Sequence, residues 1–166
     1  MQTDSDIRHH TAHLFRFTVP NLPEMAFVIA QQEVVEVSEI PPLTRVPFAP
    51  FFVIGISKWR ARLLTVIDMA SAFLSSHPKT PFAESNRRYL ITQTAIDTGS
   101  EFIAWPVEIG SRVQSVSSQV LAAEKPPHLN PAMIRTVIHV ENETLIWLNV
   151  EGIVQSTLDS GLARIT

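Results

Sequence analysis

The chain has 166 residues, enough for one domain or for two small lobes that share a core. Its net charge of −3 excludes the basic surplus that a nucleic-acid surface needs, and its lack of cysteine excludes disulfides and thiolate chemistry. Charged residues make up 17% and hydrophobic residues 45%, a balance that favours docking onto partners, although a compact monomer also fits it. The polar N-terminus carries no apolar export segment and the longest apolar run is broken by Pro50, so we expect a cytoplasmic protein without membrane insertion.

Short strand-like segments fill the first third of the chain, after an arm over residues 1–13 that we expect to be flexible. Alternating apolar residues, interrupted by proline and polar turns, predict strands over residues 14–19, 25–30 and 33–37, with a turn over 21–24. Three short strands so close together are typical of a small β barrel. The proline-rich stretch over residues 41–50 cannot form a regular helix or a central strand.

The strongest β signal is a hairpin over residues 54–69, followed by a short helical candidate over 70–74. Its tip reads Lys58-Trp59-Arg60-Ala61-Arg62, without the Gly, Asn or Asp that a tight hairpin places where φ is positive. A non-glycine residue in that conformation costs on the order of 1 kcal/mol. Three crowded cations add repulsion, so the tip indicates selection for binding. The alternative is a wider turn, with Trp59 covering the barrel end and the cations solvated.

The second half repeats the order of the first. Strands are predicted over residues 88–92, 101–105, 137–140 and 145–150. Asp68 and Asn149 occupy matching points, each ahead of a short helical candidate. We therefore predict two β lobes, over about residues 14–74 and 87–155, joined by the loop near 75–86 and followed by a C-terminal tail over 156–166.

Two further motifs could indicate catalysis or metal binding, but the evidence for each is weaker than that for the hairpin tip. Asp97-Thr98-Gly99-Ser100 spells the aspartic-protease motif, but such enzymes need two aspartates that share a proton, and these four residues also form an ordinary turn. His9, His10 and His13 have no acidic or cysteine partner nearby, so we interpret them as solvated side chains. No catalytic residue, metal or cofactor is predicted.

Residues 44–61 and 65–69 resemble the central signature of the CheW family, adaptor proteins of bacterial chemotaxis. The signature has a Pro, an apolar pair, Gly-Val/Ile and Asn-Leu-Arg-Gly, then Pro-Val-Ile-Asp-Leu after a short strand. The matching positions are Pro50, Gly55, Arg60, Val66, Ile67 and Asp68. Residues 34–37 fit the family's Val-x-Glu-Ile, Val107-Glu108 falls where Val-Asp is frequent, and 145–154 resembles its closing strand and helix. The departures are Lys58-Trp59 for Asn-Leu, Ala61 for Gly, Thr65 for Pro, and Gly110 within Val-Asp-x-Val.

The resemblance implies a mainly β fold over residues 14–155, with two intertwined five-stranded SH3/OB-like barrels, some strand exchange, a few short helices and no catalytic activity. It implies an adaptor between the cytoplasmic tip of a methyl-accepting receptor and the regulatory domain of a histidine kinase. The arginine that Arg60 matches is needed for coupling in that family. A same-fold scaffold of another motility or gene-control array is the alternative, since the departures cluster at the tip. The partner-binding candidates are Arg60, Trp59, Lys58 and Arg45, with Glu36, Val37 and Val113 for the groove between lobes.

Overall fold

The computed structural model describes residues 11–74, 87–96, 99–108, 112–117, 121–140 and 142–162. The helices in these ranges are η1 (Gln31–Glu33), α1 (Met69–Leu74), η2 (Pro131–Met133) and α2 (Val150–Leu162). The strands are β1 (Thr11–Val19), β2 (Leu22–Ala30), β3 (Val34–Ser38), β4 (Val53–Trp59), β5 (Arg62–Ile67), β6 (Arg88–Ile96), β7 (Gly99–Val107), β8 (Arg112–Ser117), β9 (Leu121–Ala123), β10 (Ile134–Val140) and β11 (Glu143–Leu148).

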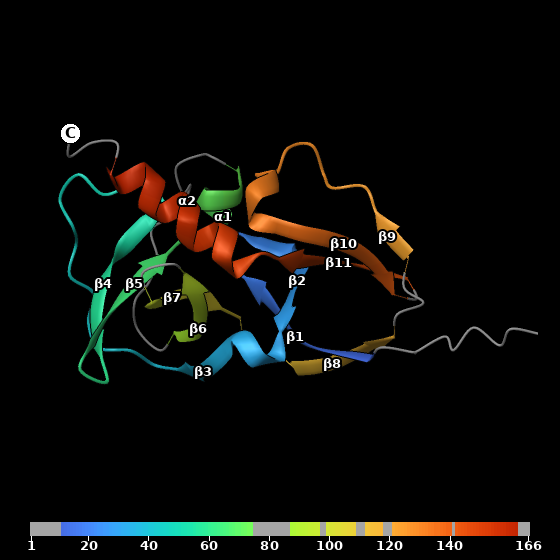
Figure 1. Cartoon of the computed structure of the whole chain (residues 1–166), viewed down its shortest axis with the longest axis horizontal. Helices are drawn as coiled ribbons and strands as arrows, with labels where there is room; N and C mark the ends of the chain where they lie inside the picture. Colours follow the sequence, from blue (N-terminus) through green and yellow to red (C-terminus); the bar gives the residue numbers. More distant parts are fainter. Residues whose placement is uncertain are drawn as a thin grey trace, which may run out of the picture.

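The strands form two sheets, which confirms the mainly β prediction (Figure 1). One has the order β8-β1-β2-β11-β10-β9 and the other the order β3-β6-β7-β5-β4. The first sheet has six strands where five were expected, because the short β9 adds to β10. Each sheet contains two antiparallel hairpins, one from each half of the chain, joined by one parallel pair of strands. Strand β2 of the β1–β2 hairpin pairs with β11 of the β10–β11 hairpin, and β5 of the β4–β5 hairpin pairs with β7 of the β6–β7 hairpin.

The two halves of the chain do not form separate lobes, so the division into residues 14–74 and 87–155 describes the repeat and not the sheets. Strands β3, β4 and β5 leave the first hairpin and join β6 and β7, while β8 returns to pair with β1. The change of sheet after β2 occurs at η1, where Glu33 Oε2 accepts a hydrogen bond from Ala30 N at 3.1 Å. The expected strand exchange therefore involves whole hairpins.

Two elements near the limits of the described residues extend further than the sequence suggested. Residues 11–13 belong to β1 and not to a flexible arm, because they pair with residues 115–117 of β8. Helix α2 continues through Leu162, although a tail was expected from residue 156. Ser156 Oγ and Thr157 Oγ1 donate to the carbonyl oxygens four residues earlier, at 2.7 and 2.8 Å, which accommodates these hydroxyls within the helix. Strand β2 also begins at Leu22, inside the predicted turn.

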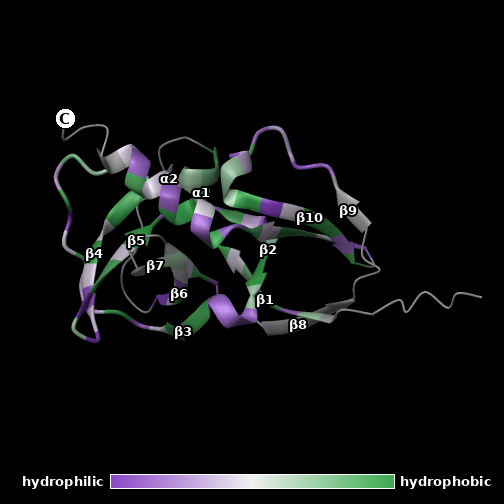
Figure 2. Ribbon diagram, viewed as in Figure 1, coloured by the Kyte–Doolittle hydropathy of each residue, from purple (hydrophilic) through white to green (hydrophobic). Residues whose placement is uncertain are grey.

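A shared core between the two sheets explains why several strands are apolar on both faces (Figure 2). Its aromatic centre joins β1 and β2 to α1 and β7, with ring centroids 5.9 Å apart for Phe17 and Phe27, 5.3 Å for Phe27 and Phe73, and 5.9 Å for Phe17 and Trp105. Each sheet also encloses a smaller cluster on its other face. Among the described residues, no helix is both long and apolar enough to cross a membrane.

Helix α2 approaches η2 so closely that only glycine fits at residue 152. A Cβ there would lie 2.1 Å from the carbonyl oxygen of Ala132 and 2.8 Å from Asn149 Nδ2. Gly152→Ala should therefore lower the free energy of unfolding by about 1–3 kcal/mol, the usual cost of overpacking. Urea denaturation measures this, with the exposed neighbour substitution Glu151→Ala as the control. Equal stabilities of Gly152→Ala and Glu151→Ala would contradict the close approach.

Candidate partner-binding site at the β4–β5 hairpin

The tip of the β4–β5 hairpin is a two-residue turn. The register ends with Trp59 opposite Arg62, and Arg60 and Ala61 between them have φ values of 46° and 60°. Positive φ at both central residues is the geometry of a type I′ turn, for which Asn and Gly are the usual residues. The wider turn of the alternative is therefore wrong, although its expectation that Trp59 is covered agrees with the burial of this side chain. The chain bears a conformational cost of about 1 kcal/mol at each of the two positions.

Trp59 is the anchor of the tip and not an exposed contact residue. It is only 8% exposed and belongs to the apolar cluster inside the second sheet, with Leu64, Val66 and Tyr89. Its ring centroid lies 5.7 Å from that of Phe102 on β7. The sequence indicated that Trp59 is unusual, and its burial shows that the indole holds the turn against the sheet.

A single carboxylate connects β3 to the tip. Glu36 Oε1 accepts hydrogen bonds from Trp59 Nε1 at 2.8 Å and from Ser38 Oγ at 2.9 Å, while Glu36 Oε2 forms an ion pair with Arg60 Nη2. These donors favour the ionised form, so they lower the pKa of Glu36, with the Trp59 hydrogen bond as the largest cause. The Arg60 guanidinium also lies 4.8 Å from the centroid of the Trp59 ring.

These contacts join the two edges of the second sheet, because β3 and β4 are its outer strands. The connection continues along β4, where Ser57 Oγ donates to Pro41 O at 2.9 Å. Thr44 and Ile56 exchange backbone hydrogen bonds of 2.8 and 2.9 Å. A Cβ at Gly55 would lie 2.7 Å from Thr44 O, so this approach also needs glycine. These side-chain and loop contacts thus join the two edge strands and give the sheet a closed, barrel-like form.

The outer side of the tip presents cations beside an exposed leucine. We define the tip patch as Lys58, Arg60, Arg62 and Leu63, all of which are exposed. Leu63 is 72% exposed and lies directly opposite Lys58 in the β4–β5 register. The Arg62 guanidinium lies 4.9 Å from the centroid of the Phe102 ring. The sequence did not single out Leu63, because an apolar residue within a strand carries no local sign that it is exposed.

Comparison with known proteins agrees with this arrangement. A family model described as the CheW-like domain matches residues 16–158. The chain belongs to this family. The fold also matches the crystal structure of the scaffolding protein TtCheW from Thermoanaerobacter tengcongensis, with a TM-score of 0.66 and 16% sequence identity, over 90% of this chain and 91% of that one. No curated protein matches the chain. Members of the CheW-like family are non-catalytic scaffolds.

The CheW-like fold brings some predicted site residues together and separates others. Glu36, Trp59 and Arg60 are in direct contact. Arg45 follows Thr44, which pairs with Ile56, and lies in the loop that leads into β4, outside the tip. Val37 packs partly buried against the shared core, and Val113 pairs with Phe15 in the other sheet.

Asp68, which matches the CheW signature, has a structural role in this chain. Its Oδ1 accepts a hydrogen bond from Ala70 N at 3.1 Å and its Oδ2 accepts one from Ser71 Oγ, so it stabilises the start of α1. Burial raises its pKa. The described ranges contain no group of His, Asp or Glu that would hold a metal ion. Asp97, His9 and His10 lie outside the described residues, and His13 is exposed on β1.

Replacing Glu36 should test the carboxylate contact through its pH dependence. Because folding lowers the pKa of Glu36, its stabilisation is complete above the ordinary value of 4.5 and is lost as the pH falls through the lowered value. Glu36→Gln should reduce the free energy of unfolding at neutral pH by about 1 kcal/mol, and this difference should shrink in acid. Urea denaturation across the pH range measures it, with Glu101→Gln on β7 as the control. A difference that is independent of pH would contradict the ionic contact.

Proposed function

We propose that this chain is a non-catalytic adaptor that couples the cytoplasmic tip of a methyl-accepting receptor to the regulatory domain of a histidine kinase in bacterial chemotaxis. Membership in the CheW-like family supports the adaptor role. The observation that carries the coupling role is the tip patch, where Arg60 is held by Glu36 and remains accessible, with 65% of its side chain exposed. We expect the protein to act in the cytoplasm, where both partners present these regions.

The chemistry of the tip patch suits a helical partner with an apolar stripe flanked by carboxylates. Leu63 offers apolar area, and Lys58, Arg60 and Arg62 offer three positive charges against the single carboxylate of Glu36. Exposed ion pairs contribute little affinity by themselves, so the cations should mainly set the orientation and the choice of partner.

The contact with Glu36 reduces the entropic cost of using Arg60. A free arginine side chain loses on the order of 1–2 kcal/mol of rotamer entropy when it is immobilised. In this chain the Glu36 carboxylate and the Trp59 ring already restrict the Arg60 guanidinium before a partner arrives. Preorganisation of this kind increases affinity without additional contacts.

A second candidate is a scaffold of the same fold in another motility or gene-control array. The observation that favours it is the composition of the tip, where Trp59 and Ala61 depart from the family's Asn-Leu-Arg-Gly. The fold is common to both candidates, so the partners distinguish them. Receptor and flagellar genes nearby would favour chemotaxis, and pilus or cyclase genes the alternative. The non-catalytic character of the CheW-like family argues against a protease that uses Asp97.

Arg60→Ala should weaken binding to the receptor-tip fragment or to the kinase regulatory domain at least tenfold, equivalent to about 1.4 kcal/mol. Both partners would come from the same organism, with affinities measured by isothermal titration calorimetry. Arg88→Ala is the matched control, since Arg88 is an exposed arginine on β6, outside the tip patch. Unchanged affinity for both partners, with the variant folded, would refute the role of Arg60.

A further inference from the structure

The loop before β4 exposes a phenylalanine in a strained turn. Ala49 N donates to Val46 O at 3.3 Å and closes a turn over residues 46–49, with Pro47 and Phe48 at its centre. Phe48 has φ 61° and is 89% exposed. A turn with proline first and positive φ second normally carries Gly or Asn at the second position. The chain therefore accepts both backbone strain and an exposed ring at Phe48, which indicates a role outside folding.

The surroundings of Phe48 combine further apolar area with a cation. Val46 is 40% exposed and Phe51 is 42% exposed. Arg45 is exposed and has neither an ion pair nor a hydrogen bond within the described part of the chain. The proline ring and the turn hydrogen bond hold Phe48 in its outward position before any partner arrives. The loop is thus a preformed apolar projection with a positive charge beside it.

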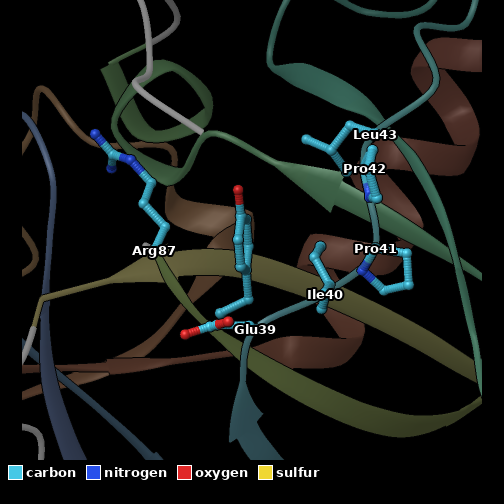
Figure 3. A pocket seen from close by; sticks show the side chains of 7 residues that line it. Glu39, Ile40, Pro41, Pro42, Leu43 and Arg87 are labelled. Atoms are coloured by element: carbon cyan, nitrogen blue, oxygen red, sulfur yellow. The ribbon is translucent and has the colours of Figure 1, made fainter. Parts of the chain in front are cut away.

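A small pocket with charged residues and apolar side chains in its lining lies at the start of the same loop (Figure 3). Arg87 and Glu39 lie on one side of it, and Ile40, Pro41, Pro42 and Leu43 on the other; Tyr89 completes the lining. The pocket has a volume of about 90 Å³, which admits a single side chain and excludes a helix. Two contacts with β4 hold the rim of the pocket in place: Ser57 Oγ donates a hydrogen bond to Pro41 O, and Thr44 and Ile56 exchange backbone hydrogen bonds.

The charges at the pocket are opposite to the charge at the projection. Glu39 is exposed and has no ion pair or hydrogen bond among the described residues. Arg87, which also lines the pocket, interacts electrostatically with the carboxylate of Asp68. Within the described residues, the carboxylate of Glu39 at the pocket and the guanidinium of Arg45 at the projection have no ion-pair partner, so each can pair with a group of a second molecule.

We propose that this chain self-associates by inserting Phe48 of one copy into the pocket over residues 39–43 of a second copy, with Arg45 of the first beside Glu39 of the second. The pocket has room for a single side chain, and Phe48 is an aromatic residue that is 89% exposed. Arg45, three positions before Phe48, carries the charge opposite to that of Glu39 at the pocket. Projection and pocket lie on one loop, so a two-fold axis makes the same contact twice and closes a dimer. The tip patch takes no part in this contact.

Sedimentation equilibrium of the full chain over a range of concentrations tests this association. Phe48→Asn should raise the dissociation constant at least tenfold. Its melting temperature should be unchanged or higher, because Asn tolerates positive φ. Leu158→Gln removes an exposed leucine from α2 and should leave the dissociation constant unchanged. A chain that stays monomeric up to about 1 mM, or a Phe48→Asn variant that associates as the parent does, would overturn the proposal.

Charge reversal tests which groups face each other. Arg45→Glu and Glu39→Arg should each weaken association at least tenfold, and the double variant should recover most of it because the pair is restored with reversed signs. The combination of Glu39→Arg with Arg88→Glu has the same net charge as the double variant but does not recreate the pair, so it should stay weak. Equal association of the two combined variants would refute the Arg45–Glu39 contact.

Discussion

The carboxylate of Glu36 is the contact on which the candidate site depends. It accepts a hydrogen bond from Trp59 and pairs with Arg60, so it ties β3 to the tip of the β4–β5 hairpin. Because β3 and β4 are the two edges of their sheet, this group helps to close the sheet and orients the exposed guanidinium. Stability and the proposed recognition therefore depend on the same atoms, and we expect a change at Glu36 to affect both.

Strain at turns distinguishes the parts of the chain that we assign to binding. Non-glycine residues with positive φ occur among the described residues at Asn21, Phe48, Arg60 and Ala61. Asparagine tolerates this conformation, so Asn21 is the ordinary solution to a tight turn. At Phe48 and Arg60 the chain bears the cost and presents an exposed ring or a cation, and Ala61 completes the turn that presents Arg60. Strain at functional surfaces is common because selection for binding offsets a modest loss of stability.

Sequence patterns predicted the hairpins well because alternation and turn residues are local signals. The central hairpin, the repeat order and the unusual tip were each visible in the sequence. The patterns did not reveal which hairpins share a sheet, because the apolar pattern of a strand does not specify which other strand it pairs with. They also failed to separate Trp59, which is buried, from Leu63, which is exposed. Burial at a strand end depends on which element covers it, and that is a tertiary property.

By itself, the sequence determined that this is a β-rich chain of the CheW type with a cationic tip, since composition, turn chemistry and the central motif are all properties of short segments. The tertiary structure decided that each sheet takes strands from both halves and that Glu36 lies against Trp59 and Arg60. It also brought residues 39–43 beside Tyr89, more than 40 positions away, to form the pocket. These contacts join residues far apart in the chain, and only the packing of the core places them together.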